Sequence, residues 1–180
     1  MNQQIALLRG INVGTAKRVS MKELQALVTT LGYTNVRTLL NSGNVVFEVP
    51  AKQKGDAAHR IEAAMAGQLG VTANVIGVTE EKLRAVIAGN PLAKIASDPS
   101  RYLVGFVEDA GELKRLEPLL TENWAPDALA VGNGAVYLWC AQGIRDSKLA
   151  KAVGRALGET VTMRNWATVL KLQALLDSGG

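Results

Sequence analysis

Cysteine and histidine are nearly absent from this chain of 180 residues, which contains one of each. A single cysteine forms no internal disulfide, and this is typical of a reducing compartment. One cysteine and one histidine also exclude an ordinary Cys/His zinc site and disfavour a Ser-His-Asp triad. The sequence therefore predicts no metal ion and no other cofactor, and it leaves open whether the protein is an enzyme. Any catalysis would depend on Arg or Lys electrostatics, backbone dipoles or a single carboxylate.

Long apolar runs and a secretory signal are missing as well. Runs such as Ile5–Leu8 are far too short to cross a bilayer, and no charged segment followed by an apolar stretch opens the chain. We therefore expect a cytoplasmic protein without membrane contact. The net charge is only +4, from 20 Lys and Arg against 16 Asp and Glu. This scattered excess favours an anionic partner weakly, because dedicated nucleic-acid domains gather basic residues into a stripe or tail. The oligomeric state stays open.

Short strands and helices alternate along the chain in an order that repeats. In the first half the pattern predicts strands at Gln4–Arg9, Val36–Asn41, Val45–Val49 and Ala73–Val78, with helices from Ser20 to Leu31, over Asp56–Leu69 and from Thr79 to Ala88. In the second half it predicts strands at Tyr102–Val107, Ala128–Val131, Ala135–Ala141 and Thr160–Met163, with helices after Asp109, over Ser147–Leu157 and from Asn165 to about Leu176. Each half thus has the order β-α-β-β-α-β-α.

That element order is the ferredoxin-like, split βαβ unit. A capping box of Ser20 and Glu23 supports the first helix, and hairpin signals at Ser42-Gly43 and Asn133-Gly134 occupy matching places in the two halves. The predicted fold class is α+β, with two fused ferredoxin-like (βαββαβ) halves whose antiparallel sheets are covered by helices. We expect the first half to span residues 1–90 and the second, with the C-terminal helix, residues 91–180.

Three separated motifs are similar to a known family. They are RGINVG at residues 9–14, SGNVVF at residues 42–47 and RNWATVLKL at residues 164–172, with Asn90-Pro91 between them. Together they resemble the domain-of-unknown-function 1697 family of bacterial proteins over essentially the whole chain. The resemblance implies an α+β fold related to the ferredoxin-like one, and it implies no particular activity. Thr15 departs from the family, whose members commonly have a second glycine there, and this counts against any role that needs a free φ at that position.

The loop RGINVGTAKRVS, residues 9–20, is the leading candidate for a binding site. Its glycines, Gly10 and Gly14, are four residues apart, which fits neither the Walker pattern nor the dinucleotide G-x-G-x-x-G pattern. Backbone N–H groups freed by these glycines, together with the basic side chains of the loop, are suited to hold a phosphate or a carboxylate. Those side chains are Arg9, Lys17 and Arg18. The favoured alternative is that the glycines only form turns and the cations are solvated.

The predicted ligand-binding residues are Arg9, Asn12, Lys17, Ser42, Asn44 and Arg164. Asn12, Ser42 and Asn44 lie close to glycines, where such residues also occur for turn reasons alone. At the other end of the chain Asn165 is a good helix N-cap, whereas Arg164 has no such structural explanation and is the better ligand candidate. The best hypothesis is therefore binding of a small anionic ligand at the RGINVG loop. An enzyme acting through Arg, Asn and Ser electrostatics is an alternative.

Aromatic residues make up only 4% of the chain, so their placement is informative. Tyr102 and Phe106 lie on one face of one predicted strand, and Tyr137 and Trp139 lie on one face of another. In a ferredoxin-like sheet these strands are the central pair, which presents stacking aromatics in RNA-recognition modules. An RNA-binding module is therefore a further alternative. However, Ala135 stands where a basic residue is expected, and we favour burial of this face because large exposed apolar patches are uncommon.

His59 and Cys140 complete the candidates. His59 lies in an alanine-rich stretch predicted to be a helix, and Cys140 lies in an apolar strand without a histidine near it in the sequence. We interpret His59 as a partly exposed helix residue rather than a general base. Cys140 is interpreted as an inert core thiol.

Overall fold

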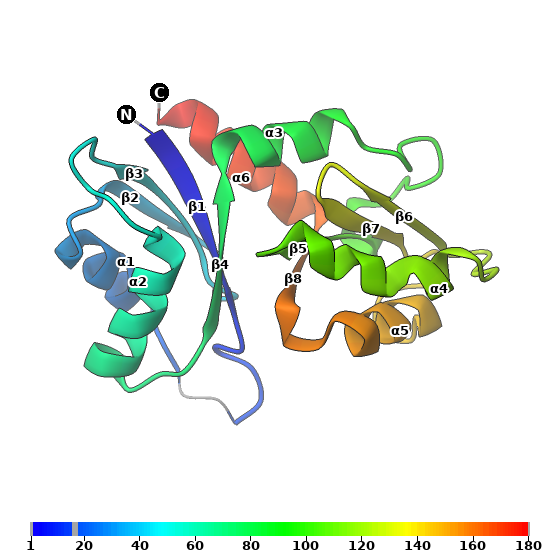
Figure 1. The fold of residues 1–180 in the computed structure, drawn as a ribbon, viewed down its shortest axis with the longest axis horizontal. Coiled ribbons are helices and arrows are strands. Elements are labelled where there is room, and N and C mark those ends of the chain that lie inside the picture. Colours follow the sequence, from blue (N-terminus) through cyan, green and yellow to red (C-terminus); the bar gives the residue numbers. More distant parts are fainter. Residues whose placement is uncertain (1, 16–17, 180) are drawn as a thin grey trace. The chain divides into compact units, whose positions relative to one another are not determined.

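The computed structural model describes residues 2–15 and 18–179, and the chain divides into two compact units (Figure 1). The first unit comprises Met1–Glu80 and Ala174–Gly180, and the second comprises Glu81–Gln173. The domain boundary expected between residues 90 and 91 stays a prediction. The helix over residues 80–88 packs on the second sheet, where the Tyr137 hydroxyl donates to the Val86 carbonyl (2.8 Å). The end of the last helix returns to the first unit, where Gln3 Nε2 donates to the Leu176 carbonyl (3.2 Å).

The first unit contains one antiparallel sheet with the strand order β2-β3-β1-β4. Its strands are β1 (Asn2–Arg9), β2 (Thr34–Leu39), β3 (Asn44–Val49) and β4 (Asn74–Thr79), and its helices are α1 (Met21–Thr30) and α2 (Ala57–Ala64), the latter continued by a π-helical segment over Met65–Leu69. The helix α3 (Glu80–Ala88) follows β4 directly.

The second unit repeats this topology with the strand order β6-β7-β5-β8. Its strands are β5 (Tyr102–Val107), β6 (Ala128–Gly132), β7 (Ala135–Trp139) and β8 (Val161–Asn165), and its helices include α4 (Glu117–Leu120), α5 (Lys148–Leu157) and the first part of α6 (Trp166–Ser178), with 3-10 segments at Pro99–Arg101, Ala110–Leu116 and Gly158–Thr160. Two four-stranded antiparallel sheets with helices confirm the predicted α+β fold. Among the described residues no helix is both long and apolar enough to cross a membrane.

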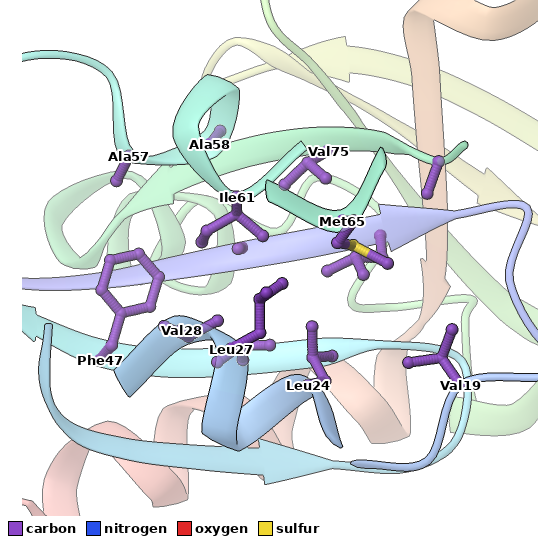
Figure 2. Close-up of a cluster of buried hydrophobic side chains, with 14 of the residues drawn as sticks. Val19, Leu24, Leu27, Val28, Phe47, Ala57, Ala58, Ile61, Met65 and Val75 are labelled. Carbon is purple, nitrogen blue, oxygen red and sulfur yellow. The ribbon is translucent and has the colours of Figure 1, made fainter. Parts of the chain in front are cut away.

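The core of the first unit lies between its sheet and the helices α1 and α2. Figure 2 shows Leu24 and Val28 of α1 facing Ile61 of α2, with Phe47 of β3 at the same level. Each of these side chains is buried. The apolar positions on α1 recur at helical spacing, so burying one face of an amphipathic helix against the sheet holds this layer together.

The core of the second unit is built in the same way. Leu103 of β5 and Leu138 of β7 pack with Leu149 and Val153 of α5 in one buried cluster. The opposite face of this sheet carries the aromatic side chains. There Tyr102 lies 5.1 Å from the Trp166 ring of α6, measured between ring centroids.

Most predicted start and stop signals act as expected. The Ser20 hydroxyl accepts from Glu23 N (3.0 Å), and the Glu23 carboxylate accepts from Ser20 N (2.9 Å), which confirms the capping box. Asn133 and Gly134 both have positive φ, at 54° and 69°, which confirms the two-residue hairpin between β6 and β7. Asn165 caps α6 by accepting from Thr168 N (2.9 Å).

Several predicted bounds differ from the structure, and two of the differences have a local cause. The strand expected over Val36–Asn41 ends at Leu39, because Leu40 adopts φ +59° and starts a turn closed by Gly43 N donating to the Leu40 carbonyl (3.3 Å). The segment after Asp109 is a 3-10 helix that only becomes α-helical at Glu117. Pro118 has no N–H to continue an α-helical ladder back through this segment.

Candidate functional site

The predicted site lies at one end of the first sheet. Arg9 is the last residue of β1 and pairs with Asn74 of β4, while Leu7 pairs with Asn44, the first residue of β3. Leu39, the last residue of β2, pairs with Asn44 as well. The loop after β1 and the turn between β2 and β3 therefore leave the sheet at the same end. Arg9 itself is half-buried.

Asn12 joins the loop to its surroundings through its side chain. Its Oδ1 accepts from Val19 N (2.7 Å), and its Nδ2 donates both to the Val19 carbonyl and to the Asn41 carbonyl (2.8 Å each). Asn12 also has φ +53°, a conformation that asparagine tolerates better than most residues. Both amide hydrogens are thus used within the protein, so Asn12 holds the loop in shape.

Ser42 and Asn44 belong to the turn that Asn12 contacts. Asn44 is fully buried and donates from Nδ2 to the Leu39 carbonyl (2.7 Å) and to Ser42 Oγ (3.1 Å). Gly43 between them has φ +92°, and a Cβ there would lie 2.8 Å from Leu8 Cβ and from Ile11 Cδ1. These contacts give the SGN motif a packing role at the base of the loop.

The basic residues predicted to bind a ligand lie in different parts of the structure. Arg18 is exposed and donates from Nη1 to the Asn12 carbonyl (2.6 Å), which places its charge on the loop. Lys17 lies outside the described residues. Arg164 belongs to the second unit, where it is buried on β8 and donates to the Met163 carbonyl (2.9 Å). Desolvation lowers the pKa of Arg164 to about 10.

The sign of φ alternates along the loop from Gly10 to Gly14. Gly10, Asn12 and Gly14 have φ of +84°, +53° and +52°, whereas Ile11 and Val13 between them do not have positive φ. Where residues of positive φ alternate with right-handed helical residues, neighbouring N–H groups point to one side and form an anion-binding concavity, called a nest. Within the described part of the chain, no hydrogen bond engages the N–H groups of residues 10–14.

The aromatic side chains on one face of the second sheet are buried. Tyr102, Phe106 and Tyr137 are at most 1% exposed, and Trp139 is 8% exposed. The Tyr102 hydroxyl donates to Asn90 Oδ1 (2.6 Å), and the Tyr137 hydroxyl accepts from Asn133 Nδ2 (3.0 Å). The expected burial of these rings is thus observed, and the RNA-binding alternative, which needs them at the surface, is not supported by this face.

His59 and Cys140 have the surroundings that their sequence context indicates. His59 is exposed on α2, with Nδ1 3.6 Å from the Asp56 carboxylate, an ion pair when the imidazole is protonated. Cys140 is fully buried, and burial raises the pKa of its thiol, so the reactive thiolate is disfavoured.

Sequence reasoning missed two features. One is a cavity of about 320 Å³ in the second unit, whose lining includes Trp124, Pro126, Asp127, Asp146 and Lys148. The other is a pair of exposed apolar side chains, Val13 and Leu40, at the end of the first sheet. A leucine beside the turn residues Asn41-Ser42-Gly43 was an available signal for the second feature.

Comparisons with known proteins agree with this fold. A family model described as "Protein of unknown function (DUF1697)" matches residues 1–137. A solved structure, described as conserved bacterial protein SP0830 from Streptococcus pneumoniae, matches with a TM-score of 0.78 at 22% sequence identity, over 97% of this chain and 98% of that chain. At this identity the likeness concerns the fold alone. A search of curated proteins finds no match.

Proposed function

The chain belongs to the DUF1697 family of proteins of unknown function, and we propose that its loop over residues 9–18 binds a small anion, either a phosphate or a carboxylate group of a larger ligand. The observation that carries this proposal is the alternating sign of φ from Gly10 to Gly14, with N–H groups that make no hydrogen bond within the described part of the chain. In this arrangement the ligand is bound chiefly by main-chain N–H groups, which need no particular side chain.

The charge of the loop supports an anionic rather than a cationic ligand. Residues 9–20 contain three basic residues and no Asp or Glu. The nearest following carboxylate, Glu23, already accepts from Ser20 N in the capping box. Arg18, whose Nη1 donates to the Asn12 carbonyl, therefore brings positive charge to the loop, and residues 9–20 contain no acidic side chain that would compensate it. Arg9, at the end of β1, carries a second positive charge next to the loop in the sequence. Lys17 adds a third charge in the sequence.

The role of Asn12 in this proposal is to position the loop. Its three side-chain hydrogen bonds hold the loop against the turn after β2 and against Val19, the residue before the N-cap of α1. A loop fixed before the ligand arrives loses less conformational entropy on binding. This also explains why an asparagine stands where the backbone needs positive φ.

We also propose that each unit is ferredoxin-like and that the protein is cytoplasmic. The classification is supported by the shared β-α-β-β-α-β order and by the matching strand orders β2-β3-β1-β4 and β6-β7-β5-β8. The location is supported by the single free cysteine, Cys140, because cysteines stay reduced in the cytoplasm.

The direct test is titration of the ¹⁵N-labelled protein with inorganic phosphate, followed by amide chemical shifts in two-dimensional NMR spectra. We expect saturable shifts of the amides of residues 10–14, with no comparable change when chloride replaces phosphate at equal ionic strength. Absence of saturable shifts at these amides would overturn the proposal.

Matched glycine variants separate the loop geometry from a general loss of stability. Gly10 has φ +84° and Gly55 has φ +102°; both are exposed in the first unit, and a Cβ at either would meet nothing within 4 Å. Alanine is strained in either conformation. We expect Gly10→Ala to weaken phosphate binding at least tenfold, on the order of one lost charge-assisted hydrogen bond, and Gly55→Ala to leave it unchanged. Equal effects of the two variants would contradict the proposal.

A further inference from the structure

Exposed apolar side chains in the first unit are concentrated beside the proposed anion site. Among its described residues, the large hydrophobic side chains that are exposed are Val13, at 59%, and Leu40, at 47%. Val13 directly follows Asn12, and Leu40 directly precedes Asn41, whose carbonyl accepts from Asn12 Nδ2. The hydrogen bond that holds the loop therefore joins the two segments that carry these apolar residues.

Leu40 is also held in an unfavourable backbone conformation. Its φ of +59° is uncommon for any residue with a side chain and is an outlier for a bulky one. The matching turn of the second unit uses Asn133 at φ +54°, a residue type that accepts this conformation. An exposed leucine gains little from packing that would offset the strain, and strained residues tend to collect at functional sites.

From these observations we propose that the ligand of the loop carries an apolar group joined to its anionic group, and that Val13 and Leu40 contact that apolar group. This inference rests on the proposed function, because the anion sets where the ligand is bound. The ligand class is an organic phosphate or carboxylate with an aliphatic or aromatic portion next to the charge. Binding would cover two side chains that otherwise expose apolar surface to water. A free organic phosphate and the headgroup of a phospholipid share this chemistry.

A homologous series of alkyl phosphates tests the apolar contact. The probes are inorganic, methyl, butyl and hexyl phosphate, titrated against the amide signals of residues 10–14. We expect the affinity to rise about twofold for each added methylene, roughly half of what complete burial of a methylene gives. Between methyl and butyl phosphate this amounts to a rise of about eightfold. Butanol, which lacks the anion, is expected to cause no saturable shift.

Two variants and a control assign the effect to the two side chains. Val13→Thr keeps the shape and adds a hydroxyl, and Leu40→Asn replaces the leucine with a residue that tolerates positive φ. We expect the double variant to lose the dependence on alkyl length, so that butyl phosphate binds no more tightly than inorganic phosphate. Ile95→Asn, at an exposed apolar position in the second unit (48% exposed), is expected to keep that dependence.

The outcomes distinguish the two proposals. Equal affinity for all the phosphates overturns the apolar contact and leaves anion binding in place. A failure of every phosphate, including inorganic phosphate, overturns the proposed function and the contact with it. Sedimentation with vesicles of phosphatidylcholine and phosphatidic acid, lost in the double variant, identifies a lipid headgroup as the source. Butyl phosphate binding without such sedimentation identifies a free organic phosphate.

Discussion

The first and second units have the same order of strands, but they connect those strands differently. After its first strand the first unit runs through residues 10–20 before α1 begins, whereas the second unit enters a 3-10 helix after residues 108–109. The turn between the second and third strands spans residues 40–43 in the first unit and residues 133–134 in the second. Both longer connections of the first unit lie at one end of its sheet. A common framework thus carries additional loops at a single place, as expected where loops supply binding residues.

The sheet faces turned away from the main helical layer differ as well. In the first unit this face carries aliphatic side chains, with Ile5 of β1 opposite Val46 of β3. In the second unit it carries Tyr102 and Tyr137, with their ring centroids 6.2 Å apart. The topology therefore constrains which positions are buried, and leaves the chemistry of the buried side chains to vary between the units.

The largest expected difference concerns the two hairpin glycines. A Cβ on Gly43 would lie 2.8 Å from Leu8 Cβ, which belongs to a central strand, whereas a Cβ on Gly134 would meet the flexible end of Lys82 at 2.8 Å. We expect Gly43→Ala to lower the free energy of unfolding by about 3 kcal/mol and Gly134→Ala by about 1 kcal/mol, since both need positive φ and only the first must also displace rigid neighbours. Urea denaturation followed by circular dichroism measures both. Equal losses would mean that the first turn is not packed as described.

A second pair of matched variants compares Asn12 with Asn133. Their φ values are +53° and +54°, so alanine introduces a similar backbone strain at each. The Asn12 side chain makes three hydrogen bonds to the backbone, and that of Asn133 donates to the Gly89 carbonyl and the Tyr137 hydroxyl. Because the strain is similar at the two positions, we expect Asn12→Ala to lower the free energy of unfolding by about 1 kcal/mol more than Asn133→Ala, at about 1 kcal/mol for the additional lost hydrogen bond. In addition, only Asn12→Ala should weaken phosphate binding; an unchanged affinity would contradict its positioning role.

Local sequence signals predicted the features that depend only on residues close together in the chain. The Ser20 and Glu23 capping box and the Asn133-Gly134 turn depend on neighbours within a few residues, so the sequence alone was enough to find them. The helix α3 is different. Its Val86 carbonyl accepts a hydrogen bond from the hydroxyl of Tyr137, a residue far away in the chain, and no local pattern encodes such a contact.

The candidate site shows the same limit. Asn12 was identified from its position between two glycines, but its partner Asn41 is supplied by a turn that sequence reasoning placed within a strand. The strand expected over Val36–Asn41 includes Leu40, which adopts positive φ although leucine rarely does so. A residue that departs from its local preference is difficult to predict for a physical reason, because tertiary contacts or function must maintain the departure.

Alkaline pH should lower the stability of the second unit through the two buried tyrosines on its sheet. Burial raises the pKa of Tyr102, with a smaller contribution from neighbouring Tyr137, and burial also raises the pKa of Tyr137 above the ordinary value of 10.0. The folded state therefore favours the neutral phenols. Their contribution to stability is complete below pH 10 and is lost as the pH rises through the unfolded value towards the folded one. We expect the free energy of unfolding, measured in urea between pH 9 and pH 11, to fall less steeply in a Tyr102→Phe/Tyr137→Phe variant. Identical slopes would show that the phenols ionise as readily in the folded chain.

The smallest expected change in stability is at Leu40, where a substitution should stabilise the protein rather than destabilise it. Asparagine adopts positive φ at a lower cost than leucine, and the exposed Leu40 side chain loses little packing when it is replaced. We therefore expect Leu40→Asn to raise the free energy of unfolding by about 0.5–1 kcal/mol, measured by urea denaturation. The reverse change in the second unit, Asn133→Leu, should destabilise, because it adds the strain and removes two hydrogen bonds. A stabilised Leu40→Asn variant that also loses its preference for butyl phosphate would show that the first unit gives up stability at this turn for the sake of its ligand. A destabilised variant would instead assign Leu40 a packing role, and would remove the strain argument that separates this turn from its counterpart.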